Sequence, residues 1–442
     1  MAITKIILEK GWENREFIER NIVGFEEYVE YLNTLDINYL LEESGVEYET
    51  AQTLAELFQR GALSAFIGYG MQKYYNGGNS IRAIDALLSI TGNVGEKGAG
   101  AFYANRVYSS LLNSDPYGSE KYATSGRNFW VADFVGFIRK MNSPDSEEVP
   151  VKAIFLSKCN PLNQYPNLSQ SIDSFREIEF KVCIDMFMTD TAKECDLFIP
   201  CSNTLETEDI IYSSMHCPNL IYNEKVVEPE NKLMDEFYFF RELAKIMGMK
   251  EYPQVGKKEY LNRVLEPLDL DVEKLKNRDY VHPVPEIAWE DKIFSTPSGK
   301  IEIYSDSALR DGQSPIPVYI SGRKREESEI EKYPYRFLTP HYKNSLFSQH
   351  FMDVEGRSKL YVSWETLKKG NFQEGESVKI SSDKGEIVCE IYPDSTLREN
   401  LVYMYVGWNH KHGNPNFITQ NGSSEMGGQV TYNETFINIE KI

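Results

Sequence analysis

The sequence predicts an α/β fold, in which parallel sheets are followed by a small C-terminal β-barrel. Two observations carry this prediction. Between residues 151 and 200, short apolar strands alternate with an amphipathic helix, and successive strands begin about 28 residues apart, which suits a parallel crossover unit. From about residue 334, short strands separated by turns replace the helices, a pattern typical of a small barrel.

The N-terminal segment is expected to be mainly helical. Apolar residues recur at steps of three and four through residues 13–60, where a second amphipathic helix has Thr50 as its expected N-cap. A short buried strand over 65–67 then breaks into glycines at Gly68 and Gly70, before a helix and a glycine-rich loop. These glycines are not spaced as in a phosphate-binding loop, so tight turns are the simpler interpretation and ligand contact is the alternative.

The pattern along the chain divides it into four segments. Residues 105–150 are irregular and rich in Ser, Asn, Asp and Pro, and residues 250–330 are rich in Pro and charge. The expected division is a partial α/β domain over 1–115, an α/β domain over 116–250, a connecting segment over 251–330 and a β-barrel over 331–442.

Charge and composition exclude several classes of partner. The net charge of −20 weighs against nucleic acid and against anionic membranes, because both reward clustered Lys and Arg. No apolar run reaches the ~20 residues of a membrane span, and the N-terminus lacks the plan of a signal peptide. We therefore expect a cytoplasmic protein.

Three groups of residues are weak candidates for chemistry. Cys195 and Cys201 flank an expected strand and could form a ligand pair, although small buried side chains are the simpler interpretation. On a strand, His410 and His412 would face one side and could bind a metal; a solvated loop is the alternative. The third candidate is an acid/base pair formed by Glu206 and Glu208. The alternative is that Glu206 forms a buried structural hydrogen bond.

Polar residues follow two neighbouring strands of the expected parallel sheet. Asn160 comes after the strand over 153–157, and Asp185 ends the strand over 180–184. Ligands of open parallel sheets bind at the carboxyl ends of the strands, and a carboxylate there suits sugar hydroxyls or the donor edge of a guanine. A capping box over 191–194 would start a helix whose free backbone N–H groups favour a phosphate. The residues thus predict a nucleotide site, and a turn capped without any ligand is the alternative.

At this point the chain resembles the molybdopterin-guanine-dinucleotide oxidoreductases, the group that includes formate dehydrogenases, nitrate reductases, thiosulfate/polysulfide reductases and dimethyl sulfoxide reductases. Several motifs match in the order of the family and cover nearly the whole chain. They are GYGMQ, LLSITGNVGEKGAG, Asn160-Pro161, DMFMTDTA from Asp185, CDLFIP, TPSGKIEIYS, LTPHYKNSLFSQH and VGWNHKHGNPNFIT.

The resemblance implies a molybdenum or tungsten centre held by a bis(molybdopterin guanine dinucleotide) cofactor, with Rossmann-like domains before the barrel. Asn160, Asp185 and Thr189 would then lie near a guanosine, with Thr191 in the adjoining turn. Barrel residues would close over pterin or phosphate groups. The full set of implied cofactor contacts is Gly70, Gln72, Asn160, Pro161, Asp185, Thr189, Thr191, Asp196, Thr339, Ser348, Gln349 and Asn416.

The sequence also departs from the family. Asp190, Cys195 and Phe347 stand where the family has Glu, Ala and His. Neither the cysteine-rich iron–sulfur module nor a residue that ligates the metal has a counterpart, and Met1 falls within the third domain of the family. We therefore expect the iron–sulfur cluster to lie on another chain, no catalytic residue to be assignable here, and the segment 1–115 to expose apolar surface.

Three hypotheses fit this departure. The first is the C-terminal part of a catalytic chain, an oxidoreductase similar to formate dehydrogenase or thiosulfate/polysulfide reductase and incomplete by itself. The second is a separate subunit that completes its site with a cysteine-rich partner chain, where an electron-transfer partner is also expected. The third is a non-catalytic nucleotide-binding or chaperone-like protein.

Overall fold

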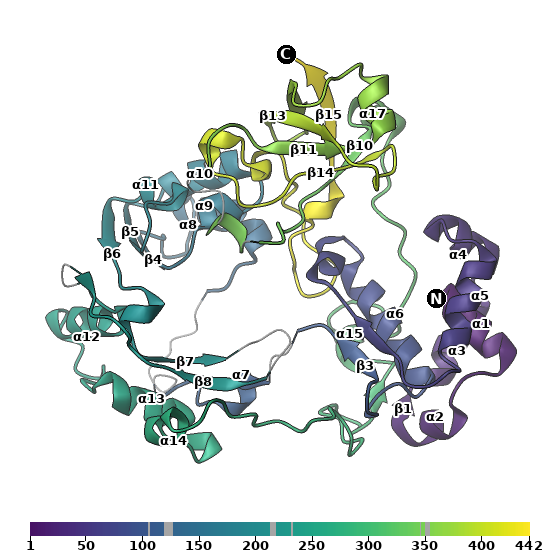
Figure 1. The fold of residues 1–442 in the computed structure, drawn as a ribbon, viewed down its shortest axis with the longest axis horizontal. Coiled ribbons are helices and arrows are strands. Elements are labelled where there is room, and N and C mark those ends of the chain that lie inside the picture. The colour runs from purple at the N-terminus through teal and green to yellow at the C-terminus, as the bar shows by residue number, and fades with distance from the viewer. Residues whose placement is uncertain (105–106, 119–126, 213–217, 231–232, 345, 350–353) are drawn as a thin grey trace. The chain divides into compact units, whose positions relative to one another are not determined.

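The computed structural model describes residues 1–104, 107–118, 127–212, 218–230, 233–344, 346–349 and 354–442. The chain forms two compact units (Figure 1). Unit 1 comprises residues 1–104, 284–324 and 424–428, and unit 2 comprises residues 105–283, 325–423 and 429–442. These two units do not test the four-segment division expected from the sequence, which stays a prediction.

Unit 1 is mainly helical, as its apolar periodicity predicts. Asn14 and Asp36 cap the second and fourth helices by accepting hydrogen bonds from Phe17 N and Tyr39 N. Thr50 is not a cap, because it lies inside a helix whose N-cap is Glu47. The elements are α1 (Ala2–Lys10), α2 (Arg15–Asn21), β1 (Ile22–Val23), α3 (Phe25–Asn33), α4 (Ile37–Ser44), α5 (Tyr48–Leu57), β2 (Ser64–Phe66), α6 (Gly77–Ile90), β3 (Gly100–Phe102), β9 (Ile301–Glu302) and α15 (Asp306–Arg310).

The strands of unit 1 form only two-stranded parallel pairs. β1 pairs with β9, and β2 pairs with β3. On the second pair, the rings of Phe66 and Phe102 stack at 5.0 Å and are 76% and 49% exposed. A parallel pair of this kind is normally one part of a sheet with both faces covered. The expectation that the segment 1–115 exposes apolar surface is therefore confirmed.

The first part of unit 2 is built on a three-stranded parallel sheet in the order β4-β5-β6, which confirms the expected crossover unit. Leu156 of β4 packs with α8 and α10 on one face of the sheet, and Val182 and Ile184 of β5 pack with α12 on the other. The elements are α7 (Tyr108–Leu111), α8 (Phe134–Asn142), β4 (Ala153–Ser157), α9 (Pro161–Gln164), α10 (Leu168–Arg176), β5 (Phe180–Asp185), α11 (Asp190–Lys193) and β6 (Leu197–Pro200).

An antiparallel hairpin and three helices follow the sheet. The hairpin was not predicted from the sequence, because the segment around it lacks a two-residue turn signal. Its strand β8 packs with α13 and α14 around Leu220, Leu261 and Leu265. The elements are β7 (Asp209–Tyr212), β8 (Leu220–Asn223), α12 (Glu236–Ile246), α13 (Lys257–Leu265) and α14 (Val272–Lys276).

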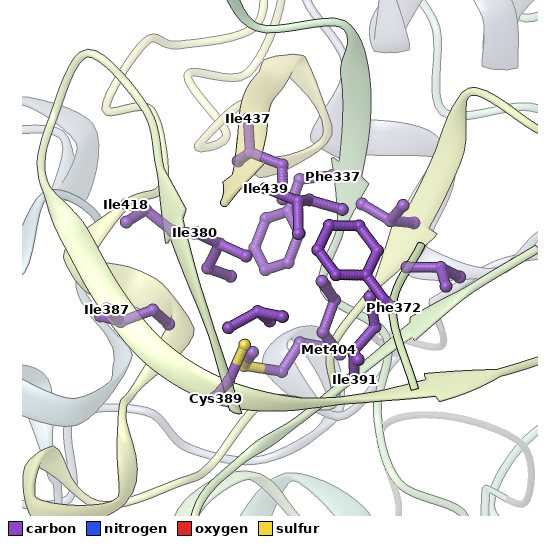
Figure 2. Close-up of a cluster of buried hydrophobic side chains, with 14 of the residues drawn as sticks. Phe337, Phe372, Ile380, Ile387, Cys389, Ile391, Met404, Ile418, Ile437 and Ile439 are labelled. Carbon is purple, nitrogen blue, oxygen red and sulfur yellow. The ribbon is translucent and has the colours of Figure 1, made fainter. Parts of the chain in front are cut away.

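The C-terminal part of unit 2 is a closed six-stranded barrel, as predicted, with the strand order β10-β14-β11-β13-β12-β15. Alternate residues of each strand point inward, and the interior is filled by aliphatic side chains, two phenylalanines, Met404 and Cys389 (Figure 2). β11 was not predicted. The elements are α16 (Glu327–Lys332), β10 (Tyr335–Leu338), β11 (Lys359–Val362), α17 (Trp364–Lys369), β12 (Ser377–Ser381), β13 (Glu386–Pro393), β14 (Leu401–Tyr403) and β15 (Thr435–Lys441).

Within the described part of the chain, the helices are too short or too polar to cross a membrane.

Candidate cofactor-binding site

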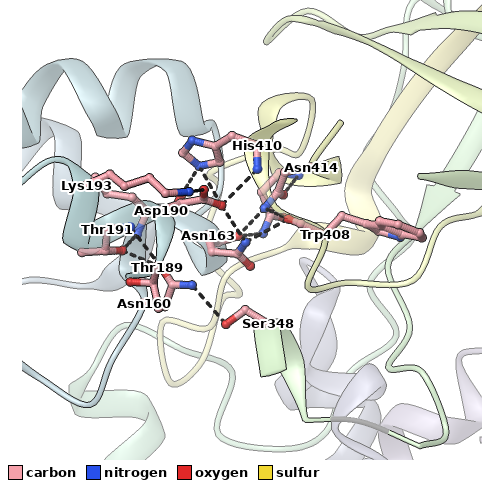
Figure 3. A network of polar contacts seen from close by, with 12 residues as sticks. Asn160, Asn163, Thr189, Asp190, Thr191, Lys193, Ser348, Trp408, His410 and Asn414 are labelled. Carbon is pink, nitrogen blue, oxygen red and sulfur yellow. Dashed lines mark hydrogen bonds and ion pairs between the residues drawn. The ribbon is translucent and has the colours of Figure 1, made fainter. Parts of the chain in front are cut away.

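Asn160 joins the end of β4 to two other elements of unit 2 (Figure 3). Its side-chain oxygen accepts hydrogen bonds from the backbone nitrogen of Thr191 at 3.2 Å and from the hydroxyl of Thr191 at 2.7 Å. Its side-chain nitrogen donates to the hydroxyl of Ser348, 3.1 Å away in the barrel part of unit 2. All three residues are buried. The structure therefore brings together Asn160, Thr191 and Ser348, and the Asn160 amide is already bonded on both sides.

The turn after β5 begins α11, but its cap differs from the one expected. Thr189 is the N-cap, and its hydroxyl accepts a hydrogen bond from Ala192 N at 3.2 Å. Thr191 lies inside the helix, where its hydroxyl also accepts from Leu162 N at 2.9 Å. The expected capping box over 191–194 is thus wrong. The N–H groups of Thr191 and Ala192 are also taken by protein acceptors, so they are not free for a phosphate.

Asp190 connects the same helix to the loop before the last barrel strand. Its carboxylate accepts hydrogen bonds from the backbone nitrogen of His410 at 3.0 Å and from the side chain of Asn163 at 3.3 Å, and Lys193 pairs with it at 3.3 Å. Asp190 is only 4% exposed, so each of these partners compensates a buried charge. Asp190 was not among the residues predicted for the site; the one signal for it in the sequence is the Asp in place of the Glu of the family.

A cluster of asparagines continues this connection. Asn414 donates to the carbonyls of Trp408 at 2.7 Å and Asn163 at 3.0 Å, and Asn416 donates to the same Asn163 carbonyl at 2.9 Å. The predicted residue Asn416 thus lies in the network, and Asn163 and Asn414 were missed. The side-chain oxygen of Asn163 is buried and has no hydrogen-bond partner within the described residues. The network fixes the asparagine-rich loop of the barrel part against α9 and α11.

Asp185 lies at the carboxyl end of β5, beside the start of this turn. It is 7% exposed, and one carboxylate oxygen accepts a hydrogen bond from Phe187 N at 3.2 Å. Among the residues that the structure describes, no hydrogen bond or ion pair engages the other oxygen. The next three side chains, Met186, Phe187 and Met188, are 40%, 51% and 50% exposed. A buried carboxylate therefore borders a small exposed apolar surface.

Two protein-family models match the sequence of this chain. The family model "Molybdopterin oxidoreductase" matches residues 9–246, more than half of the chain, and the model "Molydopterin dinucleotide binding domain" matches residues 335–436. This chain belongs to the molybdopterin oxidoreductase family.

The relatives of this molybdopterin oxidoreductase chain are longer than the chain itself. It is 30% identical to "Probable oxidoreductase YyaE" of Bacillus subtilis (strain 168), across 100% of this chain and 67% of the relative. It is 23% identical to a trimethylamine-N-oxide reductase of Vibrio vulnificus (strain CMCP6), across 100% and 63%. The structure of the acetylene hydratase from Pelobacter acetylenicus has the same fold, with a TM-score of 0.80, 19% identity and coverage of 100% and 70%. The chain thus spans about two thirds of the length of these relatives.

Asp196 lies at the opposite end of the sheet from Asp185. It precedes β6, whose last residue pairs with Asp185, and its carboxylate accepts from Lys181 N at 2.8 Å and pairs with the Lys181 ammonium at 3.0 Å. These bonds from Lys181 lower the pKa of Asp196. Asp196 therefore lies away from the candidate site of this molybdopterin oxidoreductase chain. Its carboxylate instead binds Lys181 of the neighbouring strand β5.

The remaining predicted residues of this molybdopterin oxidoreductase chain fall in several places. Pro161 starts α9 next to Asn160, Thr339 is buried at the end of β10, and Gln349 is exposed next to Ser348. Gly70 and Gln72 belong to unit 1, where the hydroxyl of Tyr103 donates to the Gln72 side chain.

The weak candidates for chemistry have structural roles. Cys195 packs in the cluster with α8 and α10, whereas Cys201 packs with α12 on the other face of the sheet, so they cannot ligate one ion together. His410 and His412 lie neither on a strand nor in a solvated loop: they form a 3-10 turn, and their rings bind the carbonyls of Leu162 and Gly356.

The carboxylates of the expected acid/base pair are bound separately. Glu206 accepts from Asn203 N at 2.7 Å, and Glu208 accepts from the hydroxyl of Tyr222 at 2.7 Å. Across the described residues, no three His, Cys, Asp or Glu side chains cluster as a metal site.

The residues around Asp185 fit the nucleotide end of a pterin dinucleotide. A buried carboxylate with an oxygen left for a donor suits guanine or ribose, and exposed Phe187 and Met188 can cover an aromatic base. The family and its dinucleotide-binding domain support a molybdenum–pterin cofactor for the chain.

Proposed function

We propose that this chain binds the guanosine end of a molybdopterin guanine dinucleotide, with Asp185 as the residue that recognises the base. The observation that carries the proposal is the buried carboxylate at the carboxyl end of β5, with one oxygen held by Phe187 N and the other left for a ligand. Ligands of open parallel sheets bind at this edge.

Guanine is the base that such a group favours. Its ring N1–H and exocyclic amine are adjacent donors that can point at the open carboxylate oxygen of Asp185, whereas adenine presents an acceptor at the corresponding ring nitrogen. The Asn160–Thr191–Ser348 contact contributes by fixing the turn that follows Asp185, and this supports a positioning role for Asn160.

The bound molybdenum centre would supply redox chemistry, and a second molybdopterin guanine dinucleotide is proposed with it; tungsten is the alternative metal. The residues of this chain hold and orient the nucleotide. We further propose that a segment N-terminal to these residues, or an iron–sulfur partner chain, supplies the metal ligand and the iron–sulfur cluster, and that an electron-transfer chain binds this assembly in the cytoplasm. The exposed Phe66–Phe102 pair supports a missing partner surface.

Calorimetric titration of the full chain with GDP and with ADP tests the base assignment. We expect GDP to bind, ADP to bind more weakly, and Asp185→Asn to weaken GDP binding by about ten- to a hundredfold, since a hydrogen bond to a charged group is worth about 1.5–3 kcal/mol. Asp173→Asn, an exposed carboxylate on α10, is the matched control and should leave GDP affinity unchanged. Equal affinities for GDP and ADP would overturn the assignment.

Co-purification tests the catalytic part of the proposal. The tagged chain, expressed with the open reading frame next to its gene, is expected to bring down a cysteine-rich chain and molybdenum or tungsten, both measured by mass spectrometry. The complex is then assayed with trimethylamine N-oxide, dimethyl sulfoxide, thiosulfate and formate. If the chain binds nucleotide but the complex never carries metal, the catalytic proposal is wrong and the alternative of a non-catalytic nucleotide-binding protein takes its place.

A further inference from the structure

We propose that residues 424–428 form a strap that holds the first turn of α6 in place, with Glu425 as the residue that fastens it. In the sequence the strap lies between two segments of unit 2, yet it is part of unit 1. The start of α6 packs against the 3-10 turn Tyr69–Lys73, which carries Gly70 and Gln72. The strap would therefore set the position of two residues that the resemblance assigns to the cofactor.

Glu425 supplies the cap that the start of α6 lacks. The N-cap residue of α6, Asn76, makes no capping hydrogen bond with its side chain, which donates instead to the carbonyl of Ile320 at 2.7 Å. One carboxylate oxygen of Glu425 accepts a hydrogen bond from the backbone nitrogen of Asn79 at 2.8 Å. This carboxylate also lies at the positive end of the helix dipole. A residue 346 positions along the chain thus replaces a local cap.

The side chain of Asn79 makes this contact specific. Its nitrogen donates to the same oxygen of Glu425 at 3.2 Å, and its oxygen accepts from Val318 N at 3.1 Å. The bond from Val318 fixes the orientation of the amide, so that its donor side faces the strap. The second carboxylate oxygen of Glu425 is buried and has no hydrogen-bond partner within the described residues. The carboxylate is therefore held through its contacts with Asn79.

The backbone of the strap is also fixed. Glu425 N donates to the carbonyl of Tyr75 at 3.0 Å, and the side chain of Gln313 donates to the carbonyl of Glu425 at 2.7 Å. At the base of the strap, Ser423 and Val430 form an antiparallel bridge. The strap is therefore a short loop with a closed base and a bonded tip, and not a free segment.

Two consecutive glycines give the start of α6 room for close neighbours. A Cβ on Gly78 would lie 2.5 Å from the Cβ of Met426 in the strap. A Cβ on Gly77 would lie 2.8 Å from the carbonyl oxygen of Met71 and 2.9 Å from the Cα of Gln72. Each distance is well inside van der Waals contact, so a larger residue would displace its neighbour. The first turn of α6 therefore links the strap to the turn that carries Gln72.

The proposal rests on contacts within the chain and does not depend on the proposed function. Its readout is the protection of backbone amides from hydrogen exchange, which reports local opening. Binding of GDP, which tests the role of Asp185, is a separate measurement, so the two proposals can fail independently.

Hydrogen exchange of the full chain, followed by peptide mass spectrometry, tests the role of Glu425. Glu425→Ala should speed exchange in residues 421–430 and 69–80 by about tenfold or more, because hydrogen bonds to a charged group are lost. Glu26→Ala, the matched control, removes an exposed carboxylate from the first turn of α3 and should leave both segments unchanged. Circular dichroism checks that each variant is folded.

A second set of variants tests the close approach without any change in charge. Alanine favours a helix more than glycine does, so Gly78→Ala would slow exchange at the start of α6 if nothing lay against it. With the strap in place, we expect Gly78→Ala to displace Met426 and to speed exchange in residues 421–430. Adding Met426→Gly removes the clashing Cβ and should restore slow exchange, whereas adding Met426→Ala keeps that Cβ and should not.

Three results would overturn the proposal. The first is equal exchange of residues 421–430 in Glu425→Ala and in the natural chain. The second is a strap that opens in Glu425→Ala while residues 69–80 stay protected. The third is slower exchange in both segments of Gly78→Ala. The two sets of variants are independent, so the test holds even if one of them does not fold.

Discussion

Thr191 donates two hydrogen bonds to the side-chain oxygen of Asn160, from its backbone nitrogen at 3.2 Å and from its hydroxyl at 2.7 Å. The Asn160 nitrogen donates in turn to Ser348. One amide thus holds the end of β4, the helix after β5 and a loop of the barrel part in one arrangement. A short polar side chain at this point determines the geometry of three elements.

Replacement of Asn160 by Leu should strongly destabilise unit 2. The change leaves the buried Thr191 N–H without its acceptor and removes the donor to Ser348. A buried group left unsatisfied costs about 1–3 kcal/mol, so we expect a loss of about 2–4 kcal/mol in the free energy of unfolding, measured by urea denaturation and by melting temperature.

Asn277→Ala is the matched control for this change. Asn277 is exposed at the end of α14, where its amide donates to the carbonyl of Glu273. Its loss should change stability by less than about 0.5 kcal/mol. If the two variants melt alike, the Asn160 contacts do not stabilise the native state in the way the distances suggest.

Gly407→Ala should displace the loop that carries Ser348. Gly407 has a φ of +97°, and a Cβ there would lie 1.8 Å from the carbonyl oxygen of Phe347. Because that atom belongs to the backbone, the segment must move, and we expect a loss of about 3 kcal/mol or more and a lower melting temperature.

Gly375 is the control that separates the cost of a left-handed backbone from the cost of a steric clash. Gly375 has a φ of +78°, but a Cβ there meets only the Tyr392 hydroxyl at 3.7 Å. Gly375→Ala should cost only the left-handed backbone penalty of about 1–2 kcal/mol. An equal cost at the two positions would show that the close approach of Phe347 is relieved without penalty.

Stability should fall at alkaline pH partly through Cys201. Burial, aided by the charge of Glu236, raises the pKa of Cys201 to about 11 from an ordinary value of 9.0. The folded chain holds this proton more tightly than the unfolded chain, so the contribution is complete below pH 9 and is lost as the pH rises through 11. It amounts to about 2–3 kcal/mol.

Melting curves from pH 8 to pH 11 check this sign. The natural chain should lose more stability across this range than Cys201→Ala, which has no thiol to ionise at that position. Parallel curves for the two proteins would contradict the assignment to Cys201, whatever the absolute difference between them.

The natural chain should bind a hydrophobic dye through unit 1. The stacked, exposed rings of Phe66 and Phe102 lie on a two-stranded parallel sheet that leaves an apolar face uncovered. The double variant Phe66→Ser/Phe102→Ser should remove most of the dye fluorescence, and Trp364→Ser, a single exposed ring on α17, should remove little. A dye-silent natural chain would argue against a missing partner surface.

The sequence by itself determined the fold class and most of its elements. Apolar alternation and spacing are local properties, so they specified the parallel strands around residues 153–185 and the barrel strands after 334. The motifs specified the family. The sequence missed β11 and the β7–β8 hairpin, because short strands without turn signals are stabilised by partners that lie far along the chain.

Only the tertiary structure decided how the site residues are used. It joined Asn160 to Thr191 and Ser348, added Asp190 and Asn163 to the network, and set Asp196 at the other end of the sheet from Asp185. A hydrogen bond depends on distances of a few tenths of an ångström between residues far apart in sequence. Residue type and spacing do not determine those distances, and packing does.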